Sequence, residues 1–164
     1  MNEADVHGTF LVVDDDDDVR KVVCSHLQSA GFTVHDASSG AAAVNAFPTV
    51  RPDLVFLDVM MPAMDGFQTA EKIRALDGGA TTSIVFLTAH GEIENFKKAL
   101  PTNPSDFLTK PIARAALIDR ARSLCKAKHV REISHLAREI AMDASVSERT
   151  RAQAEAIIEA ARKL

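Results

Sequence analysis

The sequence predicts an α/β fold in which a parallel, five-stranded sheet carries helices on both faces. Short apolar runs rich in β-forming residues alternate along the chain with segments of helical periodicity. Two of these runs, residues 54–57 and 84–87, are apolar at every position, as expected of strands buried on both faces. Parallel neighbours need a crossover connection, which helices supply. The alternation therefore favours a parallel sheet covered on both sides.

The elements follow one another in a regular order. The predicted strands are residues 10–13, 33–35, 54–57, 84–87 and 107–108. The intervening segments have apolar residues at three-four spacing, which predicts helices at about 19–30, 40–47, 66–76, 93–100 and 113–126. Gly31 ends the first of these helices, because glycine readily adopts the backbone angles that close a helix.

After residue 126 the pattern becomes helical alone. Ser145 and Glu148 have the spacing of a capping box, which predicts a second helix running to the end of the chain. We therefore expect two regions, a domain at 1–126 and a helical hairpin at 127–164. A two-helix hairpin buries little by itself, so its apolar stripe either packs on the first domain or forms a homodimer. Both alternatives stay open.

Composition narrows the function. The chain has 164 residues, 46% of them hydrophobic, and a formal net charge of -4, so it lacks the basic surplus that direct nucleic-acid binding needs. The N-terminus has no signal-peptide pattern and no stretch reaches the length of a membrane span, so we expect a cytoplasmic protein without membrane contact. Cys24 and Cys125 are too far apart to indicate a metal site and are expected to be reduced.

Polar side chains stand where the predicted strands end. In an open parallel sheet, ligands bind beyond the carboxyl ends of the strands. The residues at those ends are Asp14 and Asp15 after the first strand, Asp58 after the third, Thr88 after the fourth and Lys110 after the fifth. We therefore expect three acids, a hydroxyl and an ammonium group at one edge of the sheet.

This set of residues predicts a magnesium site and an aspartyl phosphate. Three converging carboxylates repel one another unless a cation lies among them, and Mg²⁺ prefers hard oxygen ligands. Lys110 adds positive charge and Thr88 a hydrogen-bond donor, which suits a phosphoryl group bound near Asp58. An aspartate carboxylate can act as the nucleophile toward phosphorus when a metal neutralises the approaching charge.

Four motifs together resemble the receiver domain of bacterial two-component response regulators, over residues 9–126. They are VVDD at 12–15, LDVMMPAMDG at 57–66, LTA at 87–89 and FLTKP at 107–111. The resemblance implies a sheet of order 2-1-3-4-5 and a phosphoacceptor at Asp58. It implies metal ligation by Asp14, Asp15, Asp58 and the backbone carbonyl of Met60. It also implies phosphoryl contacts by Thr88 and Lys110, with Thr88 and Phe107 as switch residues.

Other residues near these motifs have structural interpretations. Asp16, Asp17 and Asp18 fall where a helix begins, and acids favour that end through capping and the helix dipole. Pro62 and Gly66 are expected to shape the loop after Asp58, the glycine by tolerating positive φ. The resemblance further implies a cis peptide between Lys110 and Pro111. His90, two residues beyond Thr88, is at a position that tunes phosphoryl lifetime in this family.

The favoured function is a phosphorylation-dependent switch that receives its phosphoryl group from a sensor histidine kinase or a histidine phosphotransfer protein. The role would be signalling rather than enzymatic turnover. A haloacid-dehalogenase-type phosphatase is a competing hypothesis, because Asp14 and Asp16 fit its Asp-x-Asp motif, but it leaves the LDVMMP segment unexplained.

A third hypothesis assigns the chain to a hybrid histidine kinase or a scaffold whose C-terminal helices dimerise. His135 follows a serine, as the phosphoacceptor of kinase dimerisation helices often does. Leu136 and Ile140 depart from that pattern, and the helix is expected to end near Asp143. We therefore expect His135 to be a solvated side chain.

Overall fold

The computed structural model describes residues 7–89, 106–143 and 145–162. The chain divides into two compact units, one up to residue 122 and one from residue 123 onward. The helix predicted at 93–100 lies outside the described residues. Within the three described ranges, no helix is both long and apolar enough to cross a membrane.

The first unit contains the predicted parallel sheet. Its strands lie in the order β2-β1-β3-β4-β5, which confirms both the predicted fold and the order implied by the resemblance. All four neighbouring pairs are parallel. The strands are β1 (Thr9–Val13), β2 (Thr33–Ala37), β3 (Leu54–Asp58), β4 (Ser83–Thr88) and β5 (Asp106–Thr109).

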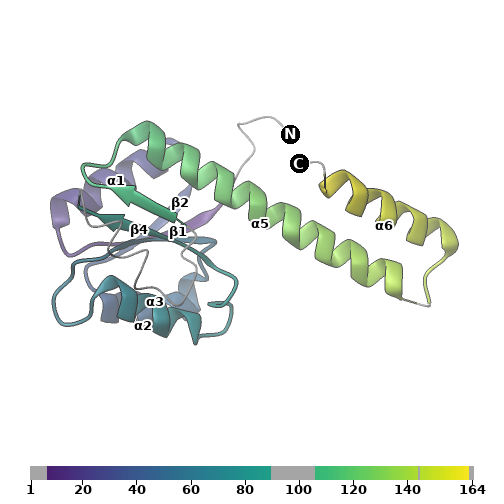
Figure 1. The fold of residues 1–164 in the computed structure, drawn as a ribbon, viewed down its shortest axis with the longest axis horizontal. Coiled ribbons are helices and arrows are strands. Elements are labelled where there is room, and N and C mark those ends of the chain that lie inside the picture. Colours follow the sequence, from purple (N-terminus) through teal and green to yellow (C-terminus); the bar gives the residue numbers. More distant parts are fainter. Residues whose placement is uncertain (1–6, 90–105, 144, 163–164) are drawn as a thin grey trace. The chain divides into compact units, whose positions relative to one another are not determined.

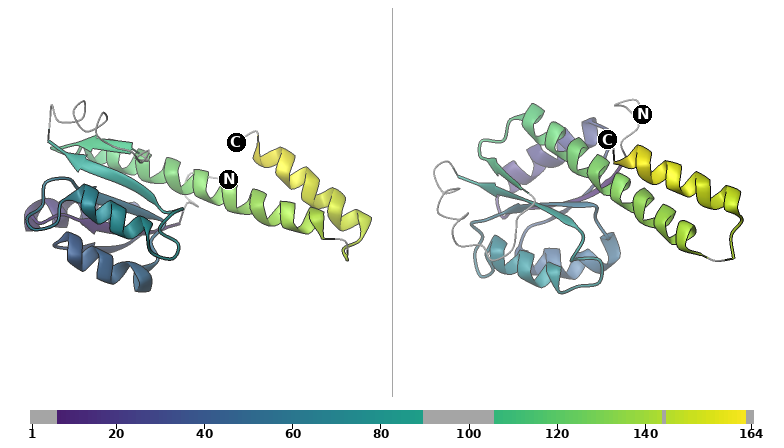
Figure 2. Two further views of the ribbon diagram at one scale, coloured as in Figure 1. Left: turned by 60° about the horizontal axis from the view of Figure 1, so that its bottom comes forward. Right: turned by 45° about the vertical axis from the view of Figure 1, so that its right-hand side comes forward.

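Helices cover both faces of this sheet (Figure 1, Figure 2). Helices α2 (Gly40–Val50) and α3 (Gly66–Arg74) pack side by side on one face. Helix α1 (Asp17–Ser29) and the first turns of α5 (Arg114–Met142) lie on the other. Every residue of β3 and β4 is buried, as their continuous apolar sequences predict for central strands. This rigid centre fixes the positions at which the strands end.

Helix α1 begins and ends as the sequence predicts. Asp16 is its N-cap, and its carboxylate accepts hydrogen bonds from the backbone N–H groups of Asp18 and Val19. Gly31, with φ of 94°, follows its C-terminus. The apolar Val22 is 51% exposed, whereas the charged Arg20 is only 8% exposed. An arginine therefore occupies a position on the buried face of this helix.

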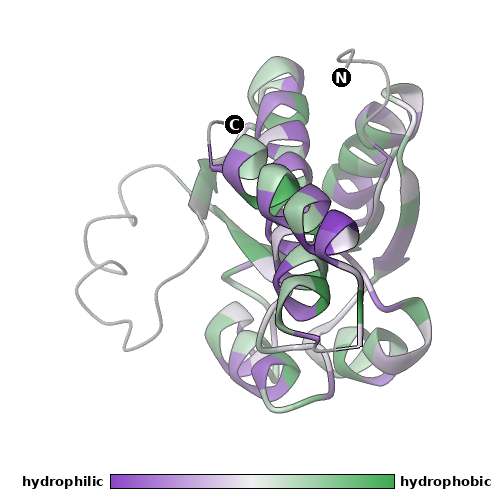
Figure 3. Cartoon of the chain, turned by 90° about the vertical axis from the view of Figure 1, so that its right-hand side faces the viewer, coloured by the Kyte–Doolittle hydropathy of each residue, from purple (hydrophilic) through white to green (hydrophobic). Residues whose placement is uncertain are grey.

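The second unit is a helical hairpin. Helix α5 continues without a break to Met142, and α6 (Glu148–Ala161) returns after a short connection. Apolar and polar residues alternate along both helices (Figure 3).

The expected capping box at Ser145 is wrong, because the Ser145 N–H and hydroxyl both donate to the carboxylate of Asp143, at 2.8 and 2.7 Å. Ser147 caps α6 instead and accepts from the N–H of Thr150 at 3.3 Å. The helix therefore starts at Glu148, two residues later than a cap at Ser145 would place it.

Candidate functional site

The polar residues predicted at the strand ends meet at one edge of the sheet. Strand register explains this, because Val13 is paired with Leu57, and Asp58 with Leu87. The chain therefore leaves β1, β3 and β4 at the same level. Asp14, Asp58 and Thr88 are 0%, 4% and 1% exposed, so the site is held by the buried ends of strands rather than by surface loops.

Three carboxylates form the acidic part of the site. Asp14, Asp15 and Asp58 each bring one carboxylate oxygen within 4.8 Å of the others. Asp14 and Asp58 are buried, whereas Asp15 is exposed at the rim. The buried Oδ2 of Asp14 accepts no hydrogen bond of good geometry from the described residues, although an ammonium group lies near it. Three hard oxygen donors at this spacing suit a divalent ion such as Mg²⁺.

Lys110 carries the positive charge nearest to this cluster. Its Nζ lies 2.7 Å from Asp14 Oδ2 and 2.8 Å from Asp58 Oδ1, so one ammonium group bridges two buried carboxylates. Its backbone N–H donates to the carbonyl oxygen of Thr88 at 2.7 Å, which ties the end of β5 to β4. The Lys110–Pro111 peptide is cis, as the resemblance implied.

The charges of the site shift one another's pKa values. Burial raises the pKa of Asp58, the charges of Asp14 and Asp15 raise it further, and the nearby Lys110 ammonium partly opposes the rise. Burial alone would lower the pKa of Lys110, but its contacts with Asp14 and Asp58 outweigh burial and raise it. Lys110 therefore stays protonated, and Asp58 is a more basic carboxylate than an exposed aspartate.

The path of the loop after Asp58 depends on a close contact between the backbones of Gly66 and Asp58. A Cβ on Gly66 would lie 2.3 Å from the carbonyl oxygen of Asp58, so only glycine fits there. The Gly66 N–H donates to the carbonyl oxygen of Val59 at 2.9 Å, and Asp65 caps α3 with a complete capping box. The expected reason for this glycine was wrong, because the positive φ of the loop, 65°, falls at Ala63.

The residues with predicted accessory roles lie around this edge. Thr88 ends β4, and its hydroxyl donates to the carbonyl oxygen of Ala89 at 3.5 Å. The half-buried ring of Phe107 stacks on Phe86, with ring centroids 5.6 Å apart. Met60 is 64% exposed, and because its thioether is a soft ligand, only its backbone carbonyl suits a hard ion such as Mg²⁺. These roles stay predictions, and His90 lies outside the described residues.

Two structural findings bear on the competing hypotheses. The carboxylate of Asp16 caps α1, so the Asp-x-Asp motif of a phosphatase is not assembled as a pair facing the site.

The side chain of His135 is 73% exposed, and its Nδ1 lies 3.7 Å from a carboxylate oxygen of Glu139. Helix α5 ends at Met142, one residue before the expected position. His135 is therefore a solvated histidine, as expected.

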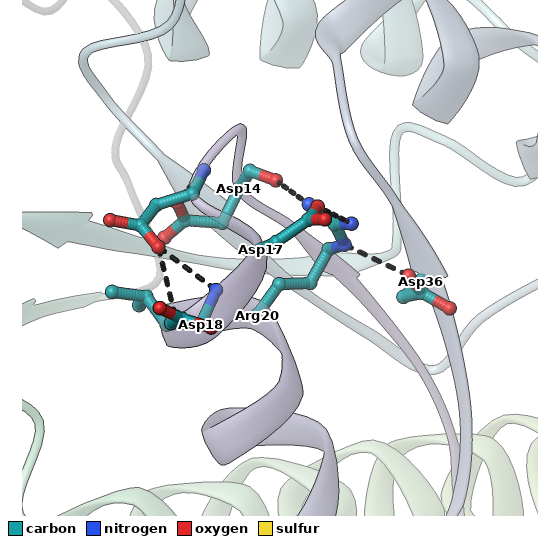
Figure 4. Close-up of polar contacts among 7 residues, drawn as sticks. Asp14, Asp17, Asp18, Arg20 and Asp36 are labelled. Carbon is teal, nitrogen blue, oxygen red and sulfur yellow. Dashed lines mark hydrogen bonds and ion pairs between the residues drawn. The ribbon is translucent and has the colours of Figure 1, made fainter.

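Arg20 is a buried residue of the site region to which the sequence analysis assigned no role. Its Nη1 donates to the backbone carbonyl oxygen of Asp14 at 2.7 Å, and its Nε donates to Asp36 Oδ2 at 2.9 Å (Figure 4). Its Nη2 pairs with Asp17. The available signal was its spacing, because Arg20, Val23 and Leu27 share the buried face of α1.

Comparisons with known proteins agree with this geometry. The family model described as the response regulator receiver domain matches residues 10–122. The chain is 33% identical over 130 residues to the regulatory protein AtoC of Escherichia coli, covering 77% of this chain and 27% of that protein. It is 31% identical over 117 residues to the DNA-binding dual master transcriptional regulator RpaA of Synechocystis, covering 71% and 48%.

A solved structure is similar as well. The chemotaxis response regulator CheY4 of Vibrio cholerae superposes with a TM-score of 0.67 at 28% identity, over 72% of this chain and 98% of that one. The chain spans about a quarter to a half of the length of the two curated relatives.

Proposed function

This chain belongs to the response regulator receiver domain family of two-component systems, and from that premise we propose that Asp58 accepts a phosphoryl group. One observation carries the proposal. Asp58 is a buried carboxylate 2.8 Å from the Lys110 ammonium group, and it lies beside two further acids at one edge of the sheet. A structural acid in a turn would not need this surrounding charge.

The proposed step is a transfer from phosphohistidine to aspartate. A carboxylate oxygen of Asp58 attacks phosphorus, the phosphorus–nitrogen bond breaks, and the imidazole of the donor leaves and takes up a proton. Lys110 stays charged and pairs with the phosphoryl oxygens, and the Thr88 hydroxyl donates to another of them.

We propose Asp14, Asp15, Asp58 and the Met60 carbonyl as the ligands of Mg²⁺. The ion would neutralise the charge that builds up between the carboxylate and the phosphoryl group. The described residues support this through the clustered oxygens and through the buried Oδ2 of Asp14. Asp15, exposed at the rim, is the ligand that an incoming ion reaches first.

Fluorine NMR with beryllofluoride tests this proposal without a kinase. With Mg²⁺ present, the protein is expected to show a bound-fluoride signal that disappears in Asp58→Asn. Asp77→Asn is the matched control, because Asp77 is an exposed acid paired with Arg51. A bound signal that persists in Asp58→Asn would refute the assignment of the acceptor.

The proposed partner is a sensor histidine kinase or a histidine phosphotransfer protein. The proposed role is a switch, since the added phosphoryl charge of about -1.5 to -2 would attract the Thr88 hydroxyl and the Lys110 ammonium and shift the loops around them. Phe107, stacked on Phe86, is the proposed ring that follows this displacement. Histidine kinases take their phosphoryl group from ATP, and we therefore propose that the switch acts in the cytoplasm.

The C-terminal residues support a second, separate role. We keep the proposed division into a receiver at 1–126 and an extension at 127–164, and propose that the extension joins two copies of this chain. Its helices meet through Ala137 and Ala154, both 3% exposed, which are small side chains. Larger apolar side chains stay 42–58% exposed beside them, namely Ile133, Leu136, Ile140 and Ile157.

A second copy suits this surface in shape and charge. The exposed side chains line an apolar groove of about 270 Å³ between α5 and α6. Residues 127–164 contain seven Lys or Arg and six Asp or Glu, so two copies can pair opposite charges around an apolar centre. Light scattering on the full chain is expected to give twice the monomer mass, and the monomer mass in Leu136→Glu. A monomeric wild type would refute the dimer.

A further inference from the structure

Arg20 forms a buried polar cluster that the proposed phosphoryl chemistry does not use. It is 8% exposed, and its guanidinium group contacts three elements at once (Figure 4). Nη1 donates to the carbonyl oxygen of Asp14 beyond β1, Nε donates to Asp36 in β2, and Nη2 pairs with Asp17 in the first turn of α1. A buried arginine with several partners is a rigid connection between those elements.

The contact with Asp14 fixes a peptide plane. The carbonyl of Asp14 and the N–H of Asp15 belong to one planar unit, so a hydrogen bond to that carbonyl sets the direction in which the chain enters Asp15. The other side of Asp14 is already held. Its N–H donates to the carbonyl oxygen of Ala37 at 3.2 Å, and its Oδ1 accepts from the N–H of Asp16 at 3.0 Å.

Asp15 depends most on this arrangement. It is exposed, whereas Asp14 and Asp58 are buried and already paired with Lys110. The orientation of its carboxylate toward the other two therefore follows from the backbone on which it stands.

We propose that Arg20 is a positioning residue for the acidic pair, holding the Asp14–Asp15 peptide so that both carboxylates face a divalent ion. The inference rests on the proposed metal site. Asp36 and Asp17 hold the guanidinium group in turn, with side chains 57% and 64% exposed, so they can neutralise its charge without a large desolvation penalty.

Removing Arg20 is expected to have two opposite effects on cation affinity, one electrostatic and one geometric. Losing a positive charge bonded to the backbone of Asp14 makes the site more negative, which by charge alone strengthens cation binding. Losing the hydrogen bond frees the peptide and lets Asp15 turn away, which weakens cation binding. Our proposal requires that the second effect prevails.

The test is Mn²⁺ binding measured by electron paramagnetic resonance in the unphosphorylated full chain. The chain has no tryptophan or tyrosine, so a direct measurement of bound ion is preferable to intrinsic fluorescence. Arg20→Met is expected to weaken Mn²⁺ binding about tenfold, as the loss of a residue that orients metal ligands does. Arg20→Lys keeps the charge but cannot span the three acceptors, and it is expected to show a loss of similar direction.

Arg74→Met is the matched control. Arg74 also donates to two backbone carbonyls, those of Gly79 and Thr82, but they lie before β4, at the opposite end of the sheet. It is expected to keep wild-type Mn²⁺ affinity.

The outcomes separate the inference from the proposed function. Unchanged or tighter binding in Arg20→Met or in Arg20→Lys would overturn the inference alone. A wild type that binds no Mn²⁺ would overturn the metal site itself. If Arg20→Met fails to fold by circular dichroism, Arg20→Lys decides the question.

Discussion

The ammonium nitrogen of Lys110 lies 2.8 Å from Oδ1 of Asp58, and the same nitrogen lies 2.7 Å from a carboxylate oxygen of Asp14. One positive charge therefore balances part of a cluster that holds three negative ones. The same contact therefore affects both the stability of the domain and the reactivity of Asp58. A substitution that removes the Lys110 ammonium group leaves the carboxylates to repel one another.

Lys110→Met is expected to destabilise the protein by about 3 kcal/mol in the absence of metal, because it leaves buried carboxylates without their cation. Mg²⁺ is expected to restore part of that loss, since the ion supplies positive charge to the same oxygens. Thermal unfolding of both proteins with and without Mg²⁺ measures the difference. Equal stabilisation of the two by Mg²⁺ would contradict this coupling.

Asp58→Asn is expected to change how stability depends on pH. The pKa of Asp58 is raised above its ordinary value of 3.8, chiefly by burial. The folded state therefore keeps this proton at a pH where the unfolded chain has lost it. The stabilising contribution is complete below 3.8 and is lost as pH rises through the folded pKa.

The variant lacks this titration, so its free energy of unfolding relative to wild type is expected to increase as pH rises through that interval. Urea unfolding of both proteins without metal, at a series of pH values, measures the effect. A difference that stays constant from acid to neutral pH would contradict it.

Cys24 is expected to react slowly with iodoacetamide. Burial first, and then the charge of Asp36, raise the pKa of its thiol from 9.0 to about 11, so little thiolate exists at neutral pH. Alkylation in a Cys125→Ser background is expected to accelerate only as pH approaches 11.

Asp36→Asn is expected to shift that acceleration to lower pH, because it removes a negative charge that disfavours the thiolate. An alkylation rate that already levels off near pH 9.0 in the Cys125→Ser protein would show that Cys24 has an ordinary thiol pKa, and would contradict the prediction.

Gly66→Ala is expected to lower stability by about 2 kcal/mol, because the new methyl group would meet the backbone oxygen of Asp58 at 2.3 Å. Relieving that contact moves the backbone where β3 ends at Asp58, so Mn²⁺ binding is expected to weaken as well. Ala75→Gly, at the other end of α3, is the comparison variant for a loss of stability without a change at the site. Full Mn²⁺ affinity in Gly66→Ala would show that the loop tolerates a side chain there.

The convergence of these side chains could be predicted because strand ends are strong signals. Asp14, Asp58 and Lys110 follow apolar runs whose length and composition define the strands, and a parallel sheet brings such ends to one edge. Their meeting depends on backbone topology rather than on side-chain detail. That is why the acidic cluster could be expected before any coordinates.

The sequence pattern was less informative where two nearby residues could each fill the same structural role. Ser145 and Ser147 can each cap a helix, and the carboxylate of Asp143 decides the outcome by engaging Ser145. On α1, Arg20 occupies the buried face because Asp36 of β2 and Asp17 of the same helix pair with its guanidinium group. The first outcome depends on which of two local hydrogen bonds forms, and the second depends on a contact with β2; hydrophobic periodicity encodes neither.

The most direct test of the central claim is to identify the residue that becomes phosphorylated. The protein is incubated with acetyl phosphate and Mg²⁺, the acyl phosphate is reduced with borohydride to homoserine, and the peptides are sequenced by mass spectrometry. The account predicts homoserine at position 58 and none when Mg²⁺ is chelated. Modification at Asp14 or Asp15, or modification at Asp58 that does not depend on the metal, would contradict it.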